Sequence, residues 1–164
     1  MTLRLILMRH AKSSWDDPAL SDHARPLNGR GRRSASASGD WLRAQGLLPD
    51  QILSSSSERT RETCARLGLD ATAQFTDTLY HAGPATMLRV LRGASGQTVL
   101  MLGHNPGIAD FAHALVATPP PHPGFGTYPT CATLVADFPV TDWADLAPGT
   151  GQTVDFIVPR DLTG

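Results

Sequence analysis

The sequence is poor in cysteine: only Cys64 and Cys131 occur among its 164 residues. Two isolated thiols cannot build the disulfide framework of a small secreted protein, and they lack the paired spacing of a metal or redox site. The chain also has no apolar run long enough to cross a membrane. Its apolar stretch from Thr2 to Met8 is too short for a signal peptide and is followed at once by Arg9. We therefore expect a cytoplasmic protein.

The chain carries no excess of charge of either sign. Its 14 Lys and Arg residues against 15 Asp and Glu residues give a net charge of −1. A protein without a basic field has little attraction for nucleic acid or an anionic membrane, so we expect neither as a partner. One stretch, Arg30 to Arg33, is locally basic. It falls in a helical pattern, and we interpret it as a solvated helix face.

Length and composition fit one domain spanning residues 1–164. Hydrophobic residues make up 41% of the chain and charged residues 18%, enough apolar material for one core. Short apolar runs predict strands at 3–8, from 51 to 53 and on into the serines that follow, at 98–102, at 132–138 and at 153–158. Helical spacing and capping residues predict helices at 28–45, 58–67, 84–91 and 106–116. This alternation predicts an α/β sandwich.

Three of the predicted strands end in polar residues. Arg9 and His10 close the first strand, residues 54–59 follow the second, and residues 103–106 follow the third. Ligands of α/β sheets bind outside the carboxyl ends of the strands. If the three strands are parallel neighbours, we expect these clusters to meet at one place.

The side chains of these clusters suit a phosphoryl group. Arg9 and Arg59 offer permanently charged guanidinium groups that match phosphate oxygens. His10, neutral over much of the physiological range, is a nucleophile able to attack phosphorus, and His104 is expected to donate a hydrogen bond to the phosphate. The chain has no carboxylate cluster of the kind that holds a hard metal, so we expect no metal and no other cofactor.

Taken alone, each of these residues has a structural explanation, and their shared position is what favours a function. Hydrolysis of an ester also needs a proton donor and a base. The loop after the first strand offers Asp16, Asp17 and Asp22, although Asp22 alone could be a turn cap. Trp15 and Trp41 are expected to be packing residues.

The three clusters resemble the motifs of the histidine phosphatase superfamily, which includes the phosphoglycerate mutases. Residues 9–11 are similar to its Arg-His-Gly motif, with alanine in place of glycine, a change that small members tolerate. The stretch SSSSERTRET is similar to the pattern of the second arginine, and residues 103–107 keep Gly-His-Asn-Pro-Gly intact. The resemblance covers residues 3 to about 116. It implies a phosphoglycerate mutase-like three-layer sandwich with a mostly parallel sheet, and catalytic roles for Arg9, His10, Arg59 and His104.

Within the superfamily, the chain looks most like the short SixA-type phosphohistidine phosphatases. Residues 21–27 resemble their Asp-x-x-Arg-Pro-Leu stretch, and this makes Asp22 the candidate proton donor. Larger members carry a catalytic glutamate after the second helix, where this chain has Leu79-Tyr80-His81-Ala82. A missing glutamate fits a substrate that needs little acid assistance, such as phosphohistidine.

The expected function is removal of a phosphoryl group, through a covalent intermediate on His10, from phosphohistidine in a protein. Two alternatives stay open. One is a small-molecule phosphomonoesterase on the same scaffold. The other is a non-catalytic phosphoprotein-binding module, against which His10 argues because a pure binder needs no nucleophile.

Overall fold

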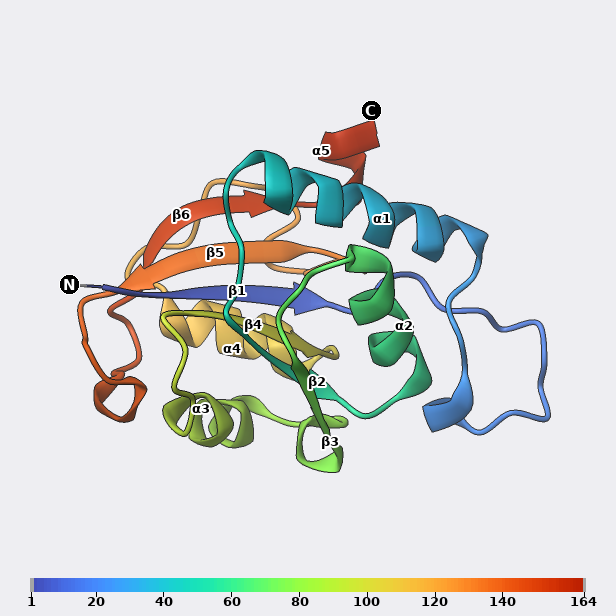
Figure 1. The fold of residues 1–164 in the computed structure, drawn as a ribbon, viewed down its shortest axis with the longest axis horizontal. Coiled ribbons are helices and arrows are strands. Elements are labelled where there is room, and N and C mark those ends of the chain that lie inside the picture. Colours follow the sequence, from blue (N-terminus) through green and yellow to red (C-terminus); the bar gives the residue numbers. More distant parts are fainter. Residues whose placement is uncertain (1, 164) are drawn as a thin grey trace.

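A computed structural model describes residues 2–163 and is built around a six-stranded sheet. The sheet has the order β3-β2-β4-β1-β5-β6 (Figure 1). β3, β2, β4 and β1 pair in parallel, and β5 and β6 add an antiparallel edge. The predicted α/β sandwich with a mostly parallel sheet is confirmed. The strands are β1 (Leu3–Arg9), β2 (Gln51–Ser55), β3 (Ala73–Thr76), β4 (Thr98–Gly103), β5 (Thr133–Phe138) and β6 (Gln152–Ile157).

Helices cover both faces of the sheet and make the three layers. In Figure 1, α1, α2 and α5 lie on one side of the sheet, and α3 and α4 lie on the other. Successive side chains of β1 point to opposite faces of the sheet. Leu5 and Leu7 pack towards α3 and α4, whereas Ile6 and Met8 pack towards α1 and α2. None of the helices within residues 2–163 is both long and apolar enough to cross a membrane. The helices are α1 (Gly29–Ala44), α2 (Glu58–Leu67), α3 (Pro84–Arg92), α4 (Gly107–Leu115) and α5 (Pro159–Thr163).

Local capping sequences set the ends of α1 and α2. The Asn28 side chain accepts a hydrogen bond from the Gly31 amide at the start of α1, and Ser57 does the same for Thr60 at the start of α2. α2 ends at Gly68, whose φ of 67° lies in the left-handed region that favours glycine. These caps explain why the predicted helices at 28–45 and 58–67 agree with the structure within a residue.

Three features differ from the expectations. β3 was not predicted, because Ala73–Thr76 is a short edge strand without an apolar run. α5, only five residues long, was not predicted either. The expectation that Trp15 packs is wrong: its side chain is 76% exposed and lies over the Arg25 guanidinium, 3.6 Å from the ring centroid.

The sheet topology brings the three polar clusters to one edge. β4 lies between β2 and β1, and all three run in parallel. The register places Arg9 opposite Gly103 and Ser54 opposite Leu102, so the three strands end at nearly the same level. The loop after β1 extends past these ends and past α2 (Figure 1). Adjacent parallel strands therefore assemble the candidate site.

Candidate active site

A pocket of about 300 Å³ opens where β1, β2 and β4 end. The structure brings together in it all five residues that the sequence singled out. Seven further residues complete the lining. The full set is Arg9, His10, Asp22, Arg59 and His104, together with Lys12, Ser13, Trp15, Arg25, His81, Asn105 and Thr130.

His10 is buried, with 6% of its surface exposed, and its hydrogen bonding fixes which nitrogen is protonated. Nδ1 lies 2.7 Å from the carbonyl oxygen of Ala11, which can only accept, so Nδ1 carries the proton. The lone pair is then on Nε2. Burial lowers the pKa of His10 from 6.5 to about 3, and the charges of Arg9 and Arg59 act in the same direction. His10 is therefore a neutral imidazole with an available nucleophilic nitrogen at physiological pH.

Three arginines around His10 hold unused hydrogen-bond donors. The Nε–H groups of Arg9, Arg25 and Arg59 are buried and have no partner within residues 2–163. A buried N–H without an acceptor is costly, and a charged one more so. Burial and the nearby charge of Arg59 also lower the pKa of Arg9. An oxyanion in the pocket would relieve both the missing acceptors and the mutual repulsion of the guanidinium groups.

His104 is held between Ser55 and Arg59. Its Nε2 lies 2.8 Å from Ser55 Oγ, and its Nδ1 accepts a hydrogen bond of 3.4 Å from Arg59 Nη2. Burial, followed by the neighbouring His10 and Arg59, lowers the pKa of His104 to about 2. The ring is therefore neutral, and its Nδ1 is an acceptor towards Arg59. The Ser55 hydroxyl can either accept from or donate to Nε2, so a change of tautomer would turn Nδ1 into a donor without adding a proton.

Asp22 lies at the mouth of the pocket as an ionised carboxylate. Its oxygens accept hydrogen bonds from Arg59 at 3.0 Å, Arg25 at 3.1 Å and the Tyr80 hydroxyl at 2.5 Å. Burial on its own would raise the pKa of Asp22. The hydrogen bonds from Tyr80 and Arg59 and the Arg59 charge outweigh it, so the pKa lies well below its usual range. Asp22 therefore reaches the pocket as a carboxylate that holds no proton.

Tyr80 and His81 also belong to the site, and sequence reasoning did not assign them a role. His81 Nε2 lies 3.1 Å from Asp22 Oδ2, and the His81 ring centroid is 5.3 Å from that of His104. Both residues occupy the segment where larger relatives were expected to carry a glutamate. A φ of 55° at His81 gives this turn a backbone shape that local sequence does not reveal.

Thr63 joins the loop that follows β1 to α2. Its hydroxyl accepts a hydrogen bond of 3.0 Å from the Ala11 amide and donates one of 2.7 Å to the Arg59 carbonyl. The buried Thr63 side chain thereby links the backbone of Ala11, which follows His10, to the backbone of Arg59. This explains the threonine one helical turn after Arg59 in the motif.

Comparison with known proteins agrees with this geometry. The sequence profile of the Histidine phosphatase superfamily (branch 1) matches residues 5–80, which include Arg9, His10, Asp22 and Arg59. An uncharacterized protein of Mycobacterium tuberculosis is 36% identical over 165 residues, covering 93% of this chain and all of that protein.

Solved structures extend the match to nearly the whole chain. A protein of Nakamurella multipartitia provisionally assigned as phosphohistidine phosphatase SixA has 30% identity and a TM-score of 0.84, with 97% of each chain covered. A similarly assigned SixA from Agrobacterium tumefaciens has 26% identity and a TM-score of 0.79, over 96% of this chain and 98% of that chain. This chain belongs to the histidine phosphatase superfamily.

Proposed function

We propose that the chain is a phosphatase that removes the phosphoryl group of phosphohistidine in a protein by transferring it first to His10. Nε2 of His10 forms a bond to phosphorus as the bond to the substrate's imidazole nitrogen breaks. The substrate's imidazole already carries a proton on its other ring nitrogen, so it leaves as a neutral ring that keeps the electron pair of the broken bond. Water then attacks the phosphorus on His10, which releases inorganic phosphate and restores the neutral imidazole.

One observation carries the proposal: a neutral histidine with its lone pair on Nε2 lies among three arginines whose buried Nε–H groups find no acceptor among residues 2–163. Phosphoryl transfer depends mainly on positioning and on stabilising charge over the equatorial oxygens. The guanidinium groups of Arg9 and Arg59 supply that stabilisation. The phosphate displaces the hydrogen bond between Arg59 and His104 Nδ1. When the ring proton of His104 moves from Nε2 to Nδ1, His104 becomes a further hydrogen-bond donor to the phosphate.

The state of Asp22 supports a substrate with an easy leaving group. An alkoxide leaves poorly without a proton, whereas a protonated imidazole nitrogen leaves as a neutral group. Asp22 is held ionised by Tyr80 and Arg59. The exposed Trp15 at the rim offers a contact surface for a protein substrate. The resemblance to proteins assigned as phosphohistidine phosphatases points to the same substrate class.

The test compares a phosphohistidine protein with a panel of alkyl phosphates, in buffer containing EDTA because the arginines already supply the positive charge. We expect kcat/KM for phosphohistidine to exceed that for alkyl esters by about tenfold or more, because an alkoxide needs a proton from Asp22, whose lowered pKa keeps it mostly ionised. Equal or greater efficiency on alkyl esters would favour the small-molecule phosphomonoesterase. Phosphate binding without turnover of any substrate would favour the non-catalytic binding module.

A further inference from the structure

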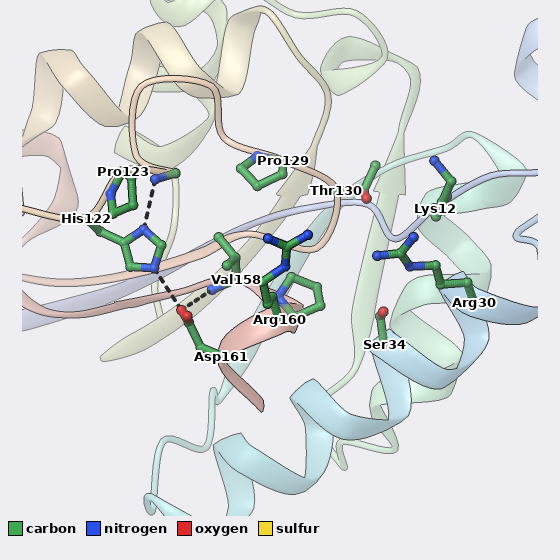
Figure 2. A pocket seen from close by; sticks show the side chains of 12 residues that line it. Lys12, Arg30, Ser34, His122, Pro123, Pro129, Thr130, Val158, Arg160 and Asp161 are labelled. Carbon is green, nitrogen blue, oxygen red and sulfur yellow. Dashed lines mark hydrogen bonds and ion pairs between the residues drawn. The ribbon is translucent and has the colours of Figure 1, made fainter. Parts of the chain in front are cut away.

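A second, larger cavity lies beside the candidate active-site pocket, which we call the phosphate pocket. Its volume is about 560 Å³, and it shares Lys12 and Thr130 with the phosphate pocket. Figure 2 shows Arg30 from α1 and Arg160 from α5 reaching into the same open space near Thr130, with Lys12 beside them. We call this cavity the basic groove. Its other lining residues are Ser34, His122, Pro123, Gly124, Pro129, Val158, Pro159 and Asp161.

The positive charge of the basic groove is not compensated. None of Lys12, Arg30 and Arg160 forms an ion pair with a carboxylate among residues 2–163. The one carboxylate in the lining, Asp161, already accepts hydrogen bonds from His122 at 2.8 Å and from the Val158 amide at 3.0 Å. Three like charges around one cavity repel one another and attract an anion.

The start of α1 adds to the positive charge around the basic groove. Arg30 and Arg33 stand in a helix that has no acidic residue in its first turn, where basic side chains oppose the helix dipole. α2 follows the ordinary pattern, with Glu58 in its first turn. The arginines of α1 therefore weaken their own helix unless an anion is nearby. Arg30 and Arg33 are exposed on α1, as the interpretation of a solvated helix face predicts, and this leaves them free to meet an anion.

We propose that the basic groove binds a second anionic group of the same substrate whose phosphoryl group enters the phosphate pocket. Lys12 and Thr130 line both cavities, so the two cavities adjoin, and we infer that one molecule can reach from one into the other. The second group is a carboxylate or a phosphate. It belongs either to an acidic residue that flanks phosphohistidine or to a small ester with two acidic groups. This inference rests on the proposed function for the first pocket.

Binding measurements on the His10→Ala protein test the inference without turnover. Titration calorimetry compares a sugar monophosphate with the corresponding bisphosphate, and a phosphohistidine peptide flanked by Glu with one flanked by Gln. We expect the second anion to tighten binding about tenfold in at least one pair, as charge-assisted hydrogen bonds do. Adding Arg30→Gln together with Arg160→Gln should abolish this gain. Arg89→Gln, an exposed arginine of α3 on the opposite face of the sheet, is the matched control and should keep it.

The outcomes separate this inference from the proposed function. A gain only with the peptide identifies a protein substrate, and a gain only with the bisphosphate identifies a small one; both support the groove. If the second anion tightens binding in neither pair, or if the tighter binding survives the double substitution, the inference about the basic groove is wrong even if the wild-type protein is an active phosphatase. Conversely, a groove-dependent gain in a wild-type protein that hydrolyses none of the substrates would overturn the proposed function alone.

Discussion

Asp22 shows how far the state of a single carboxylate depends on distant residues. Its partners Arg59 and Tyr80 lie 37 and 58 positions away in the sequence. They keep Asp22 ionised. A bound phosphoryl group competes for Arg59 and brings negative charge close to Asp22, and both effects raise the pKa of Asp22. We therefore retain Asp22 as the proposed proton donor for leaving groups that need one.

Replacing Asp22 should affect substrates according to their leaving group. Asp22→Asn should lower kcat for alkyl phosphates by roughly 10²-fold, because the donated proton is lost. Phosphohistidine and aryl phosphates should be slowed much less, since their leaving groups need little protonation. Steady-state kinetics across such a series measures the difference. Equal losses for every substrate would indicate that Asp22 only positions Arg59 and Arg25.

His81→Gln is the matched comparison for Asp22→Asn, because His81 contacts Asp22 Oδ2, the oxygen that Arg59 and Tyr80 also contact. We expect it to change the leaving-group dependence little. If the loss of kcat depends strongly on the leaving group in His81→Gln and only weakly in Asp22→Asn, His81 is the proton donor. No loss in either variant would leave Asp16, Asp17 or water, although neither aspartate lines the pocket.

At the scale of elements, the contact between α1 and the loop that follows β1 depends on one glycine. A Cβ on Gly31 would lie 2.1 Å from the Lys12 carbonyl oxygen, a backbone atom that cannot easily move. Lys12 O also accepts a hydrogen bond from the Asn28 amide. α1 therefore packs directly on the backbone two residues after His10, and only glycine allows this approach.

Gly31→Ala should both destabilise the fold and reduce activity. Overpacking of this kind destabilises by roughly 1–3 kcal/mol, and the displaced Lys12 backbone should disturb His10. Gly29→Ala is the control in the same helix, since its Cβ would meet only the Arg33 side chain at 3.5 Å. Urea unfolding and a phosphatase assay measure the two effects. Equal stability and activity in both variants would refute the proposed contact.

Elements with strong local signals were predictable from the sequence, and those without were not. The buried strand β1 and the capped helices α1 and α2 carry their signals within a few residues. β3 has a partner on only one side and a half-exposed sequence, so its identity comes from pairing with β2. α5 is held by its position against α1 rather than by any periodicity.

Across the whole molecule, one topological assumption was enough to gather the site. Placing β1, β2 and β4 as parallel neighbours brings Arg9, His10, Arg59 and His104 together. The pairing of Arg30 with Arg160 in the basic groove was not accessible in the same way. These residues lie 130 positions apart, and neither belongs to a recognisable motif, so only the folded chain places them in one cavity.

Burial of neutral histidines should make the fold sensitive to mild acid. The pKa values of His10 and His104 are lowered from 6.5 to about 3 and about 2. Between pH 6.5 and 4 the unfolded chain therefore binds protons that the folded chain does not, and stability falls as the pH falls. Asp22 acts in the same direction, but only below its ordinary pKa of 3.8.

This pH dependence is measurable by urea unfolding at several values from pH 7 to 4.5. We expect the wild-type free energy of unfolding to decline over this range. His104→Gln should decline less steeply, because one proton fewer is taken up on unfolding. Parallel slopes for the two proteins would show that His104 is not held neutral by the fold.

The central claim is that His10 carries the phosphoryl group, and trapping that intermediate tests it most directly. The protein is mixed with a phosphohistidine peptide, quenched in alkali within the first turnover and analysed by intact-protein and peptide mass spectrometry. The account predicts a species heavier by one phosphoryl group that maps to His10. It also predicts no such species in His10→Ala and turnover slower by roughly 10³-fold or more. Hydrolysis by the wild-type protein with no phosphoryl group on His10, or near wild-type turnover by His10→Ala, would contradict it.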